Sequence, residues 1–534
     1  MCDKSPSGRM QEGQRIQGQK LSPLPRWFFL LFAVVYLYAF PFFDQLRSAN
    51  EMPRILMTQE LVDRGVFYLD RRLSEFGSTG DLSRGPDGHL YPNKAPGASF
   101  LAVPAYLVCK ALGNTSLRAL TWAFRFSAVT VPALLFLPVF YRTSRRFTDE
   151  EPARRTALGA YALGSTALPY GILFFSHQVA AACAGAAFAA AAALCRRDAR
   201  HPEDAAFATG LFAGLAVMMD YQAALAAVLV GLYALVRGRR RLRNVVLMTA
   251  GALPPAAALA MYHFISFGSP LRTGYNYSFD LVTRQGFMGL VGFSRESTTS
   301  TLFLPAIGIF VLMPWILLAV VGAIGIARDP EWRRRAGAEA LVAGLVFLVY
   351  VAYLSALVPY MARGGWCVGP RYLTTCMPFV GWLAAAGFAV ADRRWLTSVA
   401  AQALVVAAAV IYLVAITTYP HWPENLANPL YELSFRLIRG GYAVHSLGTA
   451  LGLRGIWAAA PLYLFASGLL LWLLARGRRR SLPAALLACA LGAGIIYGYR
   501  SFPRTGPYAE RAWGFVTHTW EPTSAIKPLA GARP

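Results

Sequence analysis

The sequence has little cysteine, and its cysteines are not arranged to hold a metal or a disulfide framework. Seven cysteines are scattered over 534 residues, with no Cys-x-x-Cys pair and no Cys/His cluster at metal-ligand spacing. We therefore predict neither a metal site nor a redox centre. Low-complexity blocks, heptad runs and repeats of fixed period are also missing, which argues against a disordered chain, a coiled coil and a solenoid.

Charged side chains are scarce as well. Only 15% of the residues are charged whereas 56% are hydrophobic, and the mean hydropathy is +0.42. This composition is typical of a polytopic membrane protein. Acidic residues are scarcer than basic ones: the chain has 27 Asp and Glu but 51 Lys and Arg, which gives a formal charge of +24. Because the basic residues lie between apolar segments, they indicate membrane topology, and no nucleic-acid partner is expected.

Long apolar runs account for most of the remaining sequence. A membrane-spanning helix needs about 20 apolar residues, and about thirteen runs approach that length, so we predict an all-α polytopic membrane protein. The predicted spans cover residues 26–43, 119–141, 156–175, 178–195, 205–219, 221–236, 243–264, 303–327, 339–358, 372–391, 396–416, 457–475 and 482–499.

Arginines set the predicted orientation. The even-numbered spans end in arginine-rich turns at 142–146, 196–200, 237–241, 328–335, 393–394 and 476–480, which the positive-inside rule assigns to the cytoplasm. Residues 1–25 then form a cytoplasmic segment, 26–499 the transmembrane domain and 500–534 a short periplasmic tail. The first apolar run lacks a cleavage site, so we interpret it as an uncleaved anchor. The arginine- and alanine-rich composition suits the inner membrane of a GC-rich bacterium.

Four larger segments, 44–118, 265–302, 359–371 and 417–456, are predicted on the opposite, outer face, where any chemistry belongs. Residues 48–65 have the spacing of an amphipathic helix, expected to lie at the membrane interface. Residues 98–112 are too short for a span and predict a helix at the membrane surface or re-entering it. Loop 265–302 could form a polar, aromatic cover suited to sugars, or an aromatic belt.

Two residues of the first outer segment are candidates for chemistry. Glu51 would lie at headgroup level, where a carboxylate can meet both a lipid phosphate and a hydroxyl from the water phase; alternatively, it closes a Ser-x-x-Glu capping box with Ser48. Lys94 lies in a rigid turn before residues 98–112, where it offers a point charge for a phosphate. Its alternative role is to anchor the turn among lipid headgroups.

Three stretches resemble motifs of a known family. Asn50-Glu51-Met52-Pro53-Arg54, followed by Glu60-Leu61-Val62-Asp63-Arg64-Gly65, is similar to the pattern after the first span of GT-C membrane glycosyltransferases. Lys94-Ala95-Pro96-Gly97 resembles their Lys-Pro-Pro-Leu turn, and Arg371-Tyr372 with Pro378-Phe379 resembles the motif that opens a late span. The resemblance is to the protein mannosyltransferase-like and aminoarabinose transferase-like branch, the family 39 type.

The resemblance implies a GT-C-like fold and an inverting enzyme. Such an enzyme takes a sugar from a polyprenyl phosphate in the membrane and gives it to an acceptor on the outer face, without a metal or other cofactor. The partners implied are membrane lipid and a polyprenyl-phosphate-linked sugar donor; the sugar and the lipid, glycan or protein acceptor stay open. Lys94 and Arg371 match the need for cations that hold the donor phosphate as negative charge builds on it.

The sequence departs from the family pattern at one position. The first acidic residue of the family's pair, generally assigned as the catalytic base, is Asn50 here, and an amide cannot take a proton from a hydroxyl. The base is therefore expected to be Glu51 or Asp44, unless the chemistry differs or the protein is inactive. Further substrate-contacting candidates are Asn50, Arg54, Tyr91, His177, Asp220 and Tyr372. Alternatively, His177 only anchors a turn at the membrane interface, and Asp220 only lies at the solvated tip of a turn.

Two other functions compete with this interpretation. A polyprenyl-linked glycan ligase could use the late outer loop 417–456. A lipid or solute transporter also needs many helices, but the sequence shows no paired broken helices in two halves and almost no acidic residues deep within spans, which ion coupling would require.

Overall fold

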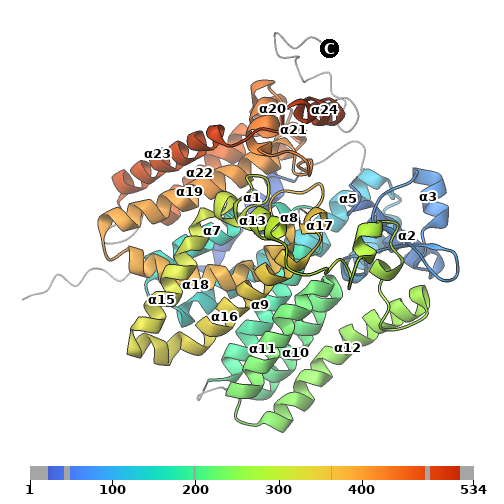
Figure 1. Cartoon of the computed structure of the whole chain (residues 1–534), viewed down its shortest axis with the longest axis horizontal. Helices are drawn as coiled ribbons and strands as arrows, with labels where there is room; N and C mark the ends of the chain where they lie inside the picture. The colour runs from blue at the N-terminus through green and yellow to red at the C-terminus, as the bar shows by residue number, and fades with distance from the viewer. Residues whose placement is uncertain (1–21, 41–47, 197–199, 363, 476–480, 518–534) are drawn as a thin grey trace, which may run out of the picture.

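The computed structural model describes residues 22–40, 48–196, 200–362, 364–475 and 481–517, and within them the chain is almost entirely helical (Figure 1). The helices of the first half are α1 Phe29–Tyr38, α2 Met52–Arg64, α3 Asp70–Phe76, α4 Gly97–Ala111, α5 Leu117–Phe124, α6 Val131–Thr143, α7 Glu151–Leu163, α8 Ala167–Tyr170, α9 His177–Leu194, α10 Pro202–Met219, α11 Ala224–Arg237 and α12 Arg241–Phe267. One two-stranded antiparallel sheet, β1 Leu82–Arg84 with β2 Leu90–Pro92, lies in the first outer segment.

The second half is helical in the same way. Its helices are α13 Arg295–Phe303, α14 Ile309–Leu312, α15 Leu317–Arg328, α16 Pro330–Ala356, α17 Pro359–Ala362, α18 Met377–Ala391, α19 Trp395–Thr418, α20 Phe435–Arg439, α21 Leu447–Ala450, α22 Ala460–Leu474, α23 Leu482–Gly498 and α24 Pro507–Phe515.

The helices confirm an all-α polytopic membrane fold. Among the described residues, seven helical stretches are long and apolar enough to cross a membrane, and further apolar helices are shorter. A helix lies within each predicted span, but two spans are interrupted. Residues 156–175 divide at Gly164 into α7 and α8, and residues 303–327 divide at Pro314 into α14 and α15. Proline lacks the amide hydrogen that a continuous helix needs, and sequence hydropathy alone does not register such a break.

Small residues bring the buried helices together. A Cβ on Gly387 of α18 would lie 1.8 Å from the Leu318 carbonyl oxygen of α15, and one on Gly210 of α10 would lie 1.8 Å from the Met248 carbonyl oxygen of α12. Only glycine permits the two backbones to approach so closely. Membrane helices commonly pack in this way, because the hydrophobic effect does not drive helices together within lipid. Helices α10, α11 and α12 lie side by side, as do α19, α22 and α23 (Figure 1).

Helix α2 follows the first anchor helix and is more deeply embedded than an amphipathic stripe predicts. Residues 52–60 are all buried, including the polar Arg54 and Thr58. The helix ends at Gly65, whose φ of 68° is left-handed and favours glycine. The predicted helix at 98–112 is present as α4, with Leu107 and Val108 exposed, and it packs against α2.

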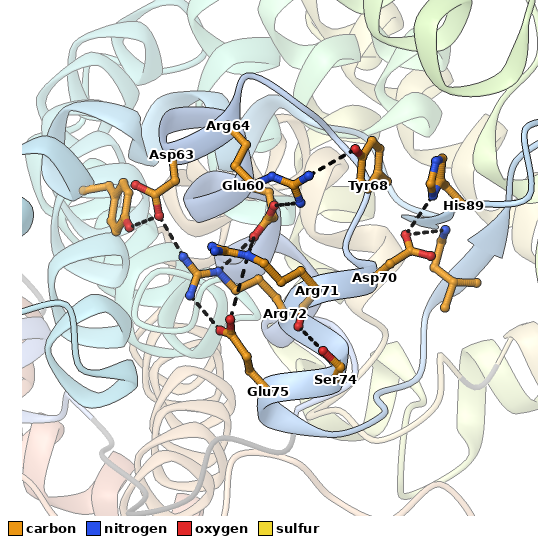
Figure 2. Close-up of polar contacts among 12 residues, drawn as sticks. Glu60, Asp63, Arg64, Tyr68, Asp70, Arg71, Arg72, Ser74, Glu75 and His89 are labelled. Carbon is orange, nitrogen blue, oxygen red and sulfur yellow. Dashed lines mark hydrogen bonds and ion pairs between the residues drawn. The ribbon is translucent and has the colours of Figure 1, made fainter.

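An ion-pair cluster ties α3 to α2 and shapes the first outer segment (Figure 2). The Glu60 side chain is fully buried. It forms ion pairs with Arg64 and Arg71 at 3.2 Å and with Arg72 at 3.0 Å. Arg72 also reaches Asp63 at 2.7 Å. The Glu-Leu-Val-Asp-Arg-Gly stretch singled out in the sequence therefore holds α3 against the end of α2 through ion pairs.

Candidate active site

A cavity with charged and apolar lining residues opens where the predicted outer loops meet. Its volume is about 530 Å³, and its wall comes from loops far apart in the sequence. A smaller niche of about 10 Å³ adjoins it, which leaves room for roughly one water molecule. Five residues line both: Asn50, Lys94, Tyr275, Arg371 and Tyr372. The structure thus brings together four of the predicted site residues, together with Tyr275 from loop 265–302.

Arg54 forms the floor of the niche. It projects from the first turn of α2, is 2% exposed, and donates to both the backbone and the side-chain oxygen of Asn50. It also donates to Ser176 Oγ at 3.3 Å. Asn50 thus positions a buried cation; its amide group cannot act as a base.

Arg371 and Lys94 add two cations to the wall. Arg371 is 8% exposed, donates to the Tyr372 hydroxyl at 3.2 Å and stacks over that ring at 5.0 Å. Its Nε has no hydrogen-bond partner among the described residues. Lys94 lies 5.1 Å from the centre of the Tyr275 ring. Lys94 and Arg371 also line the larger cavity, so two cations face a space that suits an anion such as a phosphate group, and Arg54 lies in the adjoining niche.

Asp81 is the carboxylate that the sequence analysis missed. It lines the cavity, pairs with Lys94 Nζ at 2.9 Å and accepts from Asn50 Nδ2 at 3.3 Å. Its φ of 59° is left-handed, uncommon outside glycine although Asp tolerates it better than most residues. Burial raises the pKa of Asp81, but nearby Lys94 and the arginines outweigh it, so that the pKa lies below its usual range. No motif in the sequence marks this residue.

Glu51 points away from the cavity. Its side chain is fully buried and pairs with Arg125 through two hydrogen bonds of 2.8 Å. The Phe174 amide donates to it at 2.7 Å, and His421 Nε2 lies 3.8 Å away. The backbone amide of Glu51 bonds Ser48 Oγ at 3.4 Å, as a capping box requires, but the carboxylate is committed to Arg125. Although burial raises its pKa, Arg125 lowers it more, so Glu51 is held ionised.

His177 and Asp220 meet at the niche, although two helices separate them in the sequence. The His177 ring nitrogen Nδ1 lies 2.6 Å from Asp220 Oδ2, and Gln222 Nε2 donates to the same oxygen at 2.9 Å. The opposite ring nitrogen, Nε2, has no hydrogen-bond partner among the described residues. Burial raises the pKa of Asp220, but His177, Gln222 and Arg54 together lower it below its usual range.

Another predicted site residue, Tyr91, does not line the cavity. Tyr91 lies within the first outer segment, where its hydroxyl donates to Asp87 at 2.6 Å and its ring packs against Phe267. Its role there is to hold the loop. Asp44 lies outside the described residues. Among the described residues, no three His, Cys, Asp or Glu side chains gather as a metal site would require.

No protein-family model and no curated protein matches the sequence. Solved structures match in fold. The apo structure of ArnT from Cupriavidus metallidurans aligns over 88% of this chain and 76% of its own, with 17% identity and a TM-score of 0.50. The same protein bound to undecaprenyl phosphate aligns over 88% and 77%, with 16% identity and a TM-score of 0.51. The arabinosyltransferase EmbB from Mycobacterium smegmatis aligns over 94% and 44%, with 13% identity and a TM-score of 0.39.

The likeness to ArnT defines the fold. This chain shares the helical architecture of ArnT over most of both lengths. The all-α polytopic membrane fold expected from the sequence is therefore confirmed.

Proposed function

We propose that the protein is a membrane glycosyltransferase that moves a sugar from a polyprenyl-phosphate donor to an acceptor hydroxyl on the outer face. The observation that supports this most is that Lys94, Arg371 and Asp81 line one cavity, with Arg54 in the niche beside it. Lys94 and Arg371 match the donor phosphate, and the carboxylate matches the acceptor hydroxyl. ArnT, which shares the fold, was solved with undecaprenyl phosphate.

The cavity wall is amphiphilic, as such a donor requires. Beyond the charged residues, the lining includes Met361, Trp366 and Phe515, and the Trp366 and Phe515 rings pack edge to face at 5.3 Å. We assign this apolar side to the prenyl chain next to the phosphate, while Tyr275 and Tyr372 offer rings on which a sugar can stack.

In the proposed reaction, Asp81 takes the proton of the acceptor hydroxyl, whose oxygen attacks the anomeric carbon. The bond from that carbon to the phosphate oxygen breaks, and the electron pair leaves with the polyprenyl phosphate, whose growing charge Lys94 and Arg371 neutralise. Attack opposite to the leaving group inverts the anomeric centre. No other reactant is needed for the atoms and charges to balance.

The Asp81–Lys94 pair suggests how the base is activated. In the absence of substrate, Lys94 holds the pKa of Asp81 low, which makes the carboxylate a weak base. A donor phosphate that binds Lys94 competes for this cation and leaves Asp81 less stabilised as an anion, so the pKa of Asp81 rises toward that of a more effective base. His177, whose Nδ1–H is held by Asp220, presents Nε2 as an acceptor for a sugar hydroxyl.

Lys94→Ala and Arg371→Ala test the proposal. Each charge-assisted contact to phosphate contributes about 1.5 to 3 kcal/mol, so each variant should weaken undecaprenyl phosphate binding by roughly 10- to 150-fold and nearly abolish transfer. Binding is measured on the purified protein, and turnover by release of polyprenyl phosphate from a lipid-linked sugar pool. Lys110→Ala is the matched control, since Lys110 pairs with Asp63 away from the cavity. Unaltered binding and turnover in both site variants would remove these residues from the site.

A further inference from the structure

A second charged cavity lies at the opposite ends of the helices. Helix α9 runs from His177 at the niche to Leu194, 18 residues or roughly 27 Å along the helix axis, and Arg196 just beyond it lines a cavity of about 700 Å³. We call it the arginine cavity. Arginines from four separate turns line it: Arg145, Arg146, Arg196, Arg237, Arg333, Arg334 and Arg335.

The positive charge of the arginine cavity is not matched within the protein. Its two carboxylates, Asp149 and Glu339, are already bound by Arg335 and Arg146 respectively, and Glu339 also accepts from a tyrosine hydroxyl at 3.1 Å. Among the described residues, the guanidinium groups of Arg145, Arg237 and Arg334 form no ion pair.

The positive-inside rule explains why arginines end these helices but not why they surround one hollow. Charges that share a cavity lie close to one another compared with the screening length of about 8 Å in physiological salt, so they repel. A bound anion would offset this repulsion. Guanidinium groups bind phosphate oxygens in pairs, which makes arginine the residue of choice for phosphate recognition.

We propose that the arginine cavity binds the headgroup of an anionic lipid with two phosphates, such as a diphosphatidylglycerol, from the leaflet that faces the cytoplasm. Basic pockets between the ends of membrane helices on this side suit such headgroups, and the volume falls in the range of ligand sites. Two flanking helices, α11 and α16, carry exposed apolar side chains beyond the cavity, Leu232 and Val236 on one and Leu341 on the other. Acyl chains can lie along these faces, which favours a lipid over a free diphosphate.

The test compares two triple variants of the full-length protein. The triple Arg145→Gln, Arg237→Gln, Arg334→Gln removes the three arginines without ion pairs. The matched control, Arg239→Gln, Arg240→Gln, Arg241→Gln, removes the same charge from exposed residues that follow Arg237 in its turn but lie outside the cavity lining. Binding of tetraoleoyl diphosphatidylglycerol and of dioleoyl phosphatidylcholine is titrated by native mass spectrometry, with sodium pyrophosphate as a soluble competitor.

We expect wild type and control to bind the two-phosphate lipid alike and to prefer it over phosphatidylcholine. The cavity triple should bind it about tenfold more weakly or worse, since each lost arginine removes a phosphate contact. Equal binding by both triples would overturn the proposal. The cavity triple variant could instead lose pyrophosphate binding without a matching loss of lipid binding. That result would assign the cavity to a soluble diphosphate and contradict the proposal that its ligand is a lipid. If the triple does not fold, Arg334→Gln alone against Arg240→Gln gives the same comparison.

Discussion

Two carboxylates of the first outer segment, Glu51 and Asp81, each pair with a cation, and the two pairs differ in one respect. The Glu51–Arg125 pair is fully buried, and both oxygens of Glu51 are occupied by protein donors. The Asp81–Lys94 pair lines a cavity, with 21% and 12% of the side chains exposed. Both pairs keep a carboxylate ionised, but only the second has a partner that a substrate anion can reach.

This difference assigns a structural role to the Glu51–Arg125 pair and leaves the Asp81–Lys94 pair for the proposed chemistry. A buried ion pair is costly to form and more costly to break, because removal of one partner leaves an isolated charge away from water. Arg125 begins a π-helical segment, Arg125–Thr130, within the stretch that runs from α5 to α6, so the Glu51 pair connects the first outer segment to a membrane helix. The Asp81 pair connects two parts of one loop and can open without separating helices.

Asp81→Asn should have the largest effect on activity. Loss of a general base typically costs about 10²- to 10⁴-fold in rate, whereas the partly exposed ion pair contributes at most about 1 kcal/mol to stability. We therefore expect turnover to fall by two to four orders of magnitude, roughly, with little change in melting temperature. Release of polyprenyl phosphate and thermal unfolding in detergent measure the two quantities.

Asp280→Asn is the matched control for Asp81, because Asp280 lines the same cavity and its side chain caps a backbone amide, as asparagine also can. Turnover should survive this change. Loss of transfer in Asp280→Asn with activity retained in Asp81→Asn would move the base to the other side of the cavity and undo the comparison of the two pairs.

Glu51→Gln should give the opposite pattern. It leaves Arg125 buried without a counter-charge, which costs about 3 to 5 kcal/mol, so the variant should unfold at a lower temperature while each folded molecule keeps its turnover. The double variant Glu51→Gln, Arg125→Met should recover part of the lost stability, because a buried pair replaced by less polar groups costs less than a broken one. A variant that melts like wild type but does not transfer would identify Glu51 as the base.

The sequence predicted the helical membrane fold better than the site for a physical reason. The length of an apolar run and the positions of the arginines that flank it are local properties of the chain. They suffice to predict which segments cross a bilayer and in which orientation. The neighbours Asn50 and Glu51 differ in environment because of partners far along the chain: Arg125 lies 74 residues from Glu51, and Asp81 lies 31 residues from Asn50.

Particular residues show how far the motifs reach. The family resemblance implied that Lys94 and Arg371 both hold the donor phosphate, and both line the cavity. Arg125 lies inside the predicted span 119–141, where a charged side chain needs a protein or water partner, but the sequence does not show which one. Asp81 left no signal, because its left-handed backbone and its approach to Lys94 exist only once the loop has folded.

A smaller effect should appear in the pH dependence of stability. The pKa values of Glu51 and Asp81 are both lowered in the folded protein. Each pair therefore stabilises the fold above the ordinary carboxyl pKa, about 4, and this contribution is lost as the pH falls through the lower folded value. The melting-temperature gaps between wild type and Glu51→Gln, and between wild type and Asp81→Asn, should both narrow below about pH 4. A gap that widened in acid would contradict the lowered pKa of that residue.

A change in salt concentration should have the smallest effect on these melting-temperature gaps, but it should distinguish the two ion pairs most sharply. Mobile ions screen charges that water reaches and screen buried charges much less. The small gap caused by Asp81→Asn at neutral pH should therefore shrink between about 0.01 and 1 M salt, over which the screening length falls from about 30 to 3 Å. The larger gap caused by Glu51→Gln should persist, because no water or salt reaches the Glu51–Arg125 pair. Equal salt sensitivity would mean that both carboxylates are open to solvent, and Glu51 would again be available to an acceptor hydroxyl.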